Sequence, residues 1–313
     1  MKKIIRLGSR SSPLALLQAE EIRRRLFAAR PHLSDEVDVE IVPISTTGDW
    51  KPEHQERRFI DMGGNKGLFT KEIEEALLTN AIDAAVHSMK DVASSLPQNL
   101  CIAAITARDD PRDAFIGRKA RTLDALPAGS VVGTSSLRRQ SQILAARPDL
   151  RVVPLRGNVE TRLKKLEDGL ADATLLAVAG MTRLGVKARI SSILAVSAML
   201  PAAGQGALGV EIRANDEDMR ALLAPINDAN TAACVTAERA VMRAIDGSCH
   251  TPAGAYATLT PSGQLALEAL VARADGSDMA RLAATGNAAD ADQIGEMLGT
   301  NLRKRSPPDL FVT

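Results

Sequence analysis

Six arginines stand where predicted strands give way to predicted helices, and guanidinium groups at such positions are suited to binding anions. They lie in or just after turns at the starts of predicted helices: Arg10, Arg138, Arg139, Arg156, Arg162 and Arg183. A positive side chain is disfavoured there, because the amino end of a helix already carries partial positive charge. A ligand with several negative charges removes this conflict by accepting both backbone N–H and guanidinium donors. For any one of these arginines, a solvated side chain without a ligand is the ordinary alternative.

Lys90 and Asp91 follow closely, after Ser88 and Met89, on a short segment at residues 84–87 that is predicted to be a buried strand. An aspartate in such a turn most often caps a helix or forms the turn itself. If the turn faces a cleft, a carboxylate held at the end of a strand can instead stabilise a cation or transfer a proton. Asp91 is therefore the candidate catalytic acid.

Cys249 is the candidate reactive thiol among the three cysteines. It lies in residues 246–252, DGSCHTP, where glycine and proline indicate a structured turn. Cys101 and Cys234 fall on apolar patterns and are expected to be buried and inert. A catalytic pair between Cys249 and His250 is not expected, because adjacent residues in a turn seldom point at each other.

The composition excludes several classes of protein. A net charge of +1 gives no broad basic field for nucleic acid, and 2% aromatic residues give no stacking surface for single strands. No apolar run approaches the roughly 18 residues that span a bilayer, and the charged start does not resemble a signal peptide. Three widely spaced cysteines make no disulfide framework, and no zinc spacing or glycine-rich phosphate loop is present. We therefore expect a cytoplasmic protein without a metal, a nucleic-acid partner or a membrane partner, and a monomer, because no long exposed apolar stripe is evident.

The predicted elements form two similar α/β units. In the first, a strand at residues 4–7 leads through the turn 8–12 into a helix that begins at Pro13 with Ser12 as its N-cap. Strands at 37–42 and 84–87 and a helix at 70–78 follow, separated by a long polar loop at 47–65. In the second, strands at 131–132, 151–155 and 174–179 alternate with helices that begin near 137 and 159. Such alternation predicts mostly parallel sheets covered on both faces, and the turns at 8–12 and 133–138 are expected at the carboxyl ends of these sheets, where ligands bind.

The remaining chain predicts a return to the first unit and then a third, smaller unit. Residues 201–206 indicate a linker, and 208–212 a strand. A helix begins near residue 230, a hairpin joins strands at 256–259 and 265–271, and a closing helix covers 289–302. The tail from residue 303 to 313 is expected to be loose.

These segments together resemble the porphobilinogen deaminase (hydroxymethylbilane synthase) family over nearly the whole chain. The motifs that carry the resemblance are residues 8–15 (GSRSSPLA), 66–72 (KGLFTKE), 87–92 (HSMKDV), 132–140 (VGTSSLRRQ), 155–158 (LRGN), 176–180 (LAVAG), 203–209 (AGQGALG) and the Cys249 turn. The resemblance implies an α/β fold of three domains. The first two, residues 1–106 plus 207–224 and residues 112–200, would be periplasmic-binding-protein-like with mixed, mostly parallel sheets. The third, residues 229–313, would be a small α+β domain that carries the cofactor cysteine.

The same resemblance implies an enzyme of tetrapyrrole (heme) biosynthesis. Such a transferase joins four porphobilinogen molecules head to tail with loss of ammonia to give hydroxymethylbilane. Its dipyrromethane cofactor would be bound through a thioether to Cys249, so that this cysteine is an anchor and not a turnover nucleophile. The residues around 50–65 would be a cover over the cleft.

The resemblance also assigns roles to single residues. Asp91 would be the catalytic acid. The cofactor would contact Lys90, Thr134, Ser135, Ser136, Arg138 and Arg139. Porphobilinogen or the growing chain would contact Arg10, Ser12, Gln18, Lys66, Phe69, Arg156, Arg162, Arg183 and Gln205. Acetate and propionate groups accumulate in such a cleft, so several arginines are needed to offset their repulsion.

Two other classes of function remain as alternatives. The first is a non-catalytic protein that binds an organic anion between two α/β domains. The second is a transferase for a phosphorylated substrate, but the glycine-rich phosphate loop that it needs is absent.

Overall fold

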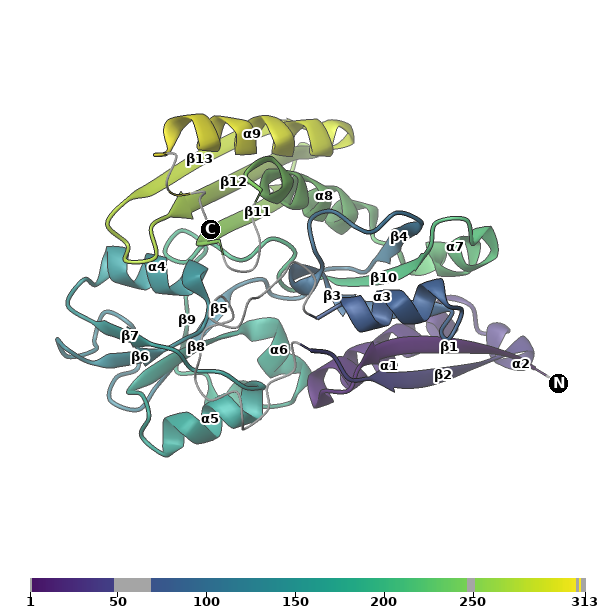
Figure 1. The fold of residues 1–313 in the computed structure, drawn as a ribbon, viewed down its shortest axis with the longest axis horizontal. Coiled ribbons are helices and arrows are strands. Elements are labelled where there is room, and N and C mark those ends of the chain that lie inside the picture. The colour runs from purple at the N-terminus through teal and green to yellow at the C-terminus, as the bar shows by residue number, and fades with distance from the viewer. Residues whose placement is uncertain (1, 48–68, 247–250, 308–309, 311–313) are drawn as a thin grey trace. The chain divides into compact units, whose positions relative to one another are not determined.

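The computed structural model describes residues 2–47, 69–246, 251–307 and 310, and these fall into two compact units (Figure 1). Unit 1 contains residues 2–47, 69–109 and 207–232. Unit 2 contains residues 110–206 and the described residues from 233 onward. The chain therefore leaves unit 1, builds a large part of unit 2, and returns to unit 1 before it completes unit 2.

Unit 1 is built on a five-stranded mixed sheet. Its strands are β1 (Lys3–Arg10), β2 (Val37–Ile44), β3 (Ala84–Ser88), β4 (Leu100–Ile105) and β10 (Leu208–Arg213), in the order β2-β1-β3-β10-β4. β1 pairs in parallel with β2 and β3, whereas β10 is antiparallel to both of its neighbours. Four of the five strands therefore run in one direction, as the sequence predicted.

Helices cover both faces of this sheet, because its central strands β3 and β10 are buried along nearly their whole length. On one face, α1 (Pro13–Ala29) and α7 (Glu217–Leu223) contribute Ile22, Leu26 and Leu223 to a core that also holds Leu7 and Val86. On the other face, α3 (Lys71–Leu78) packs its apolar side over the sheet. The short helices α2 (Leu33–Glu36), η3 (Met89–Asp91) and η5 (Ala224–Ile226) complete the described part of the unit.

Unit 2 contains a second five-stranded sheet with the same pattern. Its strands are β5 (Asp113–Gly117), β6 (Val131–Gly133), β7 (Arg151–Val153), β8 (Ala173–Ala177) and β9 (Ser192–Ile193), in the order β7-β6-β8-β5-β9. Here β5 is the antiparallel strand, in the place that β10 takes in unit 1. One face packs against α4 (Leu137–Ala146), and the other against α5 (Val159–Glu167) and α6 (Val178–Arg183). η4 (Lys187–Arg189) follows α6. The prediction of two similarly built α/β sheets is confirmed.

A three-stranded antiparallel sheet follows in unit 2. Its strands are β11 (Ala253–Leu259), β12 (Gln264–Ala272) and β13 (Met279–Asn287). The inward residues of these strands share a core with α8 (Ala229–Ala244) and α9 (Ala291–Arg305), and η6 (Ala288–Asp290) leads into α9. Figure 1 shows α9 lying along this sheet.

Several predicted boundaries were wrong. The strand expected at 174–179 ends at Ala177, and Val178 begins α6, because a short buried apolar run does not distinguish strand from helix by its periodicity. The strand expected at 151–155 ends at Val153. The closing helix continues into the expected tail, as far as Arg305. β4, β5 and β13 were not predicted at all.

Candidate active site and cofactor site

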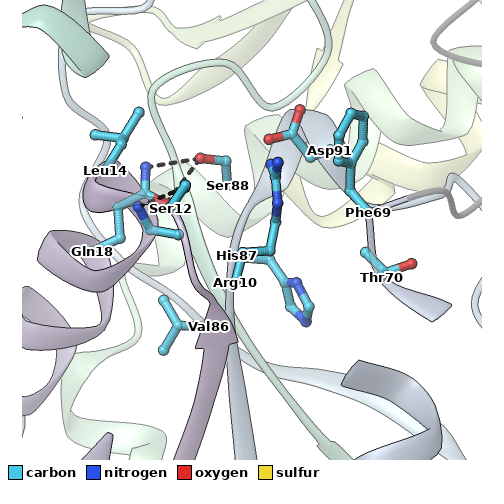
Figure 2. Close-up of a pocket in the computed structure, with 11 residues that line it drawn as sticks. Arg10, Ser12, Leu14, Gln18, Phe69, Thr70, Val86, His87, Ser88 and Asp91 are labelled. Carbon is cyan, nitrogen blue, oxygen red and sulfur yellow. Dashed lines mark hydrogen bonds between the residues drawn. The ribbon is translucent and has the colours of Figure 1, made fainter. Parts of the chain in front are cut away.

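One pocket of unit 1 gathers five of the residues that the sequence singled out (Figure 2). It lies at the carboxyl ends of β1 and β3, beside the start of α1. Its lining residues are Arg10, Ser12, Leu14, Ala15, Gln18, Phe69, Thr70, Val86, His87, Ser88 and Asp91. Arg10, Ser12, Gln18, Phe69 and Asp91 were all predicted as site residues, so a basic group and a carboxylate share this pocket.

Asp91 is held at the end of a rigid element. β3 ends at Ser88, and the single turn η3 carries Met89, Lys90 and Asp91. The Met89 N–H donates to the carbonyl of Ala207 at 3.0 Å, which ties this turn to the start of β10. Gly209 lies against the turn so closely that a Cβ atom there would be 2.1 Å from Met89 Sδ. The position of Asp91 is therefore fixed by β3, by buried Met89 and by the close approach of β10.

Arg10 ends β1 and lies over the ring of Phe69, with its guanidinium carbon 4.3 Å from the ring centroid. This distance is that of a cation–π contact, which favours an ordered guanidinium. Figure 2 shows the guanidinium end of Arg10 on the side of the pocket where Phe69 and Asp91 lie. The pocket thus presents an oriented positive group near a half-buried carboxylate.

Gln18 and Ser12 have hydrogen-bonding partners within unit 1. The Gln18 side chain is buried and lies against Ser88 (Figure 2). Gln18 Nε2 is 2.9 Å from Ser88 Oγ, and Gln18 Oε1 is 3.2 Å from the same Oγ. Ser12 is the N-cap of α1, and its side chain accepts a hydrogen bond from the Ala15 N–H, as predicted. Both side chains therefore fix the walls of the pocket, and their contact with substrate stays a prediction.

In unit 2, the hydroxyls after β6 organise the first turn of α4. Thr134 Oγ1 accepts from the Ser136 N–H at 3.2 Å, and Ser135 Oγ accepts from the Leu155 N–H at 3.1 Å. Ser136 is the N-cap of α4 and accepts from the Arg139 N–H at 3.5 Å. This cap matches that of Ser12 at α1, so the two turns are alike in build, as the sequence indicated.

Arg138 and Arg139 are both buried and both bind Asp113, the first residue of β5. Arg138 Nη2 lies 2.8 Å from Asp113 Oδ2, and Arg139 Nη2 lies 2.7 Å from Oδ1. Gln205 Nε2 also donates to Oδ1, at 3.0 Å. Burial acts to raise the pKa of Asp113, but attraction from the two guanidiniums is stronger, and the pKa lies below its ordinary value. Burial lowers the pKa of Arg138, and the negative charge of Asp113 opposes that effect.

The other predicted arginines of unit 2 lie before or on the helices α5 and α6. Arg156 is almost completely buried before α5, and Arg162 Nε donates to the Gly157 carbonyl at 2.8 Å. Arg183 was expected near the start of a helix, but it is the last residue of α6, where a positive charge is favourable. Its Nη2 donates to the Gly206 carbonyl at 2.9 Å. The electrostatic argument for an anion therefore does not apply to Arg183.

Sequence reasoning missed several buried charged or titratable residues, among them Asp113, His87 and Glu211. Asp113 was not considered, although an aspartate directly before the apolar residues 114–116 was the available signal. His87 and Glu211 form a pair with Nε2 and Oε2 3.0 Å apart, and their side chains are 3% and 0% exposed. Their separation of 124 positions along the chain gave no local signal.

Cys249, Lys66 and the expected cover at 50–65 lie outside the described residues. Lys90 lies half-buried on η3, beside Asp91. Among the described residues, no group of three or more His, Cys, Asp or Glu side chains could hold a metal ion. None of the helices in the described ranges is long and apolar enough to cross a membrane.

The protein is thus of a two-unit α/β class, in which the two sheets have equivalent strand order. Each sheet has a serine-capped helix at the carboxyl end of one of its strands, and the polar residues described above lie there. Two family models match the chain. Residues 5–221 match the dipyrromethane cofactor-binding domain of porphobilinogen deaminase, and residues 232–304 match the C-terminal domain of the same family. The chain belongs to the porphobilinogen deaminase family.

Curated relatives agree with this assignment. Porphobilinogen deaminase of Chromobacterium violaceum is 51% identical over 302 residues, which cover 96% of this chain and 94% of the relative. The protein of the same name from Thiobacillus denitrificans is 50% identical over 300 residues, with 95% and 94% covered. The expected cofactor class and place in tetrapyrrole synthesis are those of this family.

Two solved structures share weaker similarity with this chain. Lipoprotein Tp32 from Treponema pallidum is 14% identical, with a TM-score of 0.45 and with 72% of this chain and 91% of that chain covered. A periplasmic substrate-binding protein of an ABC transporter from Coxiella burnetii is 14% identical, with a TM-score of 0.43 and with 71% and 91% covered.

Proposed function

We propose that this chain joins four porphobilinogen molecules head to tail, releases one ammonia for each, and with one water yields hydroxymethylbilane. Membership of the porphobilinogen deaminase family supports this reaction. The observation that carries the proposal to single residues is the pocket that combines Asp91 with Arg10. A carboxylate and an oriented guanidinium match a substrate that carries carboxylates and becomes cationic during reaction.

Asp91 acts on the charge that develops when ammonia leaves. The methylene carbon of the substrate then becomes electron-poor, and positive charge spreads over the pyrrole ring to its N–H group. A fixed carboxylate facing that N–H stabilises the cation and can take up a proton. The turn η3 supports this role, because β3, Met89 and Gly209 hold Asp91 in one position.

Basic and polar groups bind and orient the carboxylates of the substrate and the growing chain. In unit 1 these groups are Arg10, Ser12 and Gln18, with Phe69 beside them. Lys66 is a further proposed contact of the substrate. In unit 2 these groups are Arg156, Arg162, Arg183 and Gln205. Arginine suits this task better than lysine, because its planar fork fixes the direction of a carboxylate as well as neutralising it.

The residues of unit 2 fit an acidic dipyrromethane. Arg138 and Arg139 together carry two positive charges, and Asp113 carries one negative charge. One positive charge is therefore left to pair with a carboxylate of the ligand. Thr134, Ser135, Ser136 and Lys90 complete the proposed set of contacts. When bound, the dipyrromethane supplies the primer to which substrate units are joined. Cys249 anchors it through a thioether.

The proposed domains follow the same scheme. Residues 1–106 with 207–224 form domain 1, and residues 112–200 form domain 2. Residues 229–313 form domain 3, the domain that anchors the cofactor. The match of residues 232–304 to the family's C-terminal domain supports this last boundary. We further propose that the protein is a cytoplasmic monomer, which gel filtration of the purified protein tests directly.

The first experiment replaces the catalytic carboxylate. Asp91→Asn keeps the shape of the side chain but removes its charge, so we expect folded protein with its cofactor and product formation at least roughly a hundredfold slower. Asp35→Asn, an exposed change in α2 of the same unit, is the matched control and should leave the rate unchanged. Near-normal turnover by Asp91→Asn would reject the assignment.

The second experiment separates the enzyme from a non-catalytic anion-binding protein. Intact mass under denaturing conditions should exceed the mass of the chain by a covalent dipyrromethane, and Cys249→Ser should remove the excess. In forming this adduct, each new bond to a substrate methylene carbon replaces its C–N bond, and the amine leaves as ammonia with the displaced proton. A wild-type mass equal to that of the chain, without ammonia release from porphobilinogen, would favour the binding protein.

A further inference from the structure

Asp113 is a single carboxylate that serves two guanidiniums in a dry environment. Its side chain is 0% exposed, while those of Arg138 and Arg139 are 5% and 6% exposed. Arg139 approaches Oδ1 with both Nε and Nη2, at 3.2 Å and 2.7 Å. Arg138 approaches Oδ2 with Nη2 at 2.8 Å. The two oxygens therefore hold the two arginines separately.

Further hydrogen bonds within unit 2 fix the side chains of Arg138, Arg139 and Asp113. Arg138 Nη1 donates to the Leu200 carbonyl at 2.6 Å, and Arg139 Nη1 donates to the Leu175 carbonyl at 2.9 Å. Gln205 bonds both Asp113 Oδ1 and the Pro111 carbonyl, at 3.0 Å and 2.6 Å. Each guanidinium has five N–H groups, so these bonds set its direction and still leave donors for a ligand.

The charges of this cluster do not balance. Two guanidiniums face one carboxylate, which leaves one net positive charge among three buried side chains. A buried pair of ions adds little to stability, and an uncompensated buried charge is costly. A second carboxylate at this place would neutralise the cluster, and the acidic side chains of a dipyrromethane are carboxylates.

We propose that Asp113 is a positioning residue for the cofactor: it orients Arg138 and Arg139 and leaves between them one positive charge for a ligand carboxylate. This inference rests on the proposed function, because it takes both arginines as cofactor contacts. A structural counter-ion would need only to neutralise its partners. A positioning residue must in addition make the binding of an acidic ligand faster or tighter.

The test measures how each protein acquires its cofactor. The cofactor-free fraction of purified full-length protein is incubated with porphobilinogen, and the gain of mass is followed by intact mass spectrometry. Asp113→Asn keeps the shape and removes the charge, and we expect loading at least tenfold slower than in wild type. Asp149→Asn is the matched control. Like Asp113, Asp149 accepts hydrogen bonds from an arginine, here Arg147, at both carboxylate oxygens, but it lies on an exposed turn of the same unit. The control should load at the wild-type rate.

The outcomes separate positioning from a structural role. If Asp113→Asn melts at a lower temperature but loads at the wild-type rate, Asp113 is only a counter-ion and the inference is overturned. Should Asp113→Asn not fold, Asp113→Glu decides the matter: it keeps the charge but moves the carboxylate, so slower loading supports positioning and wild-type loading overturns it. A wild-type protein that gains no mass would overturn the proposed function instead.

Discussion

Glu238 of α8 offers a sharp test of how unit 2 is held together. Its side chain is completely buried and accepts two hydrogen bonds from backbone N–H groups. Gly204, in the linker before β10, donates to Oε2 at 2.7 Å, and Ala257 of β11 donates to Oε1 at 2.8 Å. One carboxylate thus joins the linker, α8 and the three-stranded sheet.

The expected loss of stability follows from these two bonds. Glu238→Ala leaves two buried N–H groups without this acceptor, and each costs about 1–3 kcal/mol, so we expect a loss of about 2–6 kcal/mol in the free energy of unfolding. Glu238→Gln keeps one carbonyl oxygen but turns an N–H donor toward the second backbone N–H. It should therefore lose roughly half as much as the alanine variant.

Urea unfolding followed by circular dichroism measures these differences. Glu296→Ala, an exposed change on α9, is the matched control and should stay within about 0.5 kcal/mol of wild type. A loss below about 1 kcal/mol for Glu238→Ala would refute the reasoning, because the two N–H groups would then have found other acceptors. Since Gln205 follows Gly204 and holds Asp113, we also expect slower cofactor loading in Glu238→Ala.

Two further changes test backbone strain and acid stability. Gly157 has φ of +115°, and a Cβ there would lie 2.6 Å from Thr161 Cγ2. Gly157→Ala should therefore lower the free energy of unfolding, measured in urea, by about 1–3 kcal/mol. This loss should exceed that of Gly185→Ala, where φ is +72° but a Cβ would have nothing within 4 Å. Equal losses in the two variants would contradict the clash with Thr161. The pKa of Glu21 is lowered to about 2, chiefly by the hydrogen bond from Arg24, and that of Asp113 also lies below its ordinary value. Such carboxyls stabilise the fold above an unfolded pKa of about 4, and this stability is lost as the pH falls through the folded pKa. The free energy of unfolding should thus decrease from about pH 4 toward pH 2. This decrease should be less steep in Asp113→Asn. An unchanged slope in that variant would speak against the ion pairs of Asp113 with Arg138 and Arg139.

Local signals predicted the starts of α1 and α4 and the hairpin correctly. Ser12 and Ser136 cap α1 and α4, and a cap requires only residues within three positions along the chain. The pairing of β11 with β12 likewise follows from alternation around a short turn. These elements depend on their neighbours in sequence, so the sequence alone was sufficient for them.

Contacts between distant segments could not be predicted. Asp113 meets Arg138 across 25 positions and Gln205 across 92, and β10 enters its sheet between β3 and β4. β13 was missed because its residues are mostly small, and β4 because its apolar run shows no alternation. The position of Asp91 in a pocket was predicted, but the elements that hold it there, Met89 against Gly209, became visible only with the tertiary structure.

The place of β10 has a consequence for biosynthesis. During translation the ribosome releases residues 3–105, with four strands of the first sheet, long before residues 208–213, which must lie between β3 and β4. Until then β3 and β4 each have an open edge, and nascent strands with open edges invite mispairing. The N-terminal sheet therefore closes only after about a hundred intervening residues have been made. Chains that stop short of residue 208 should need chaperones to stay in solution.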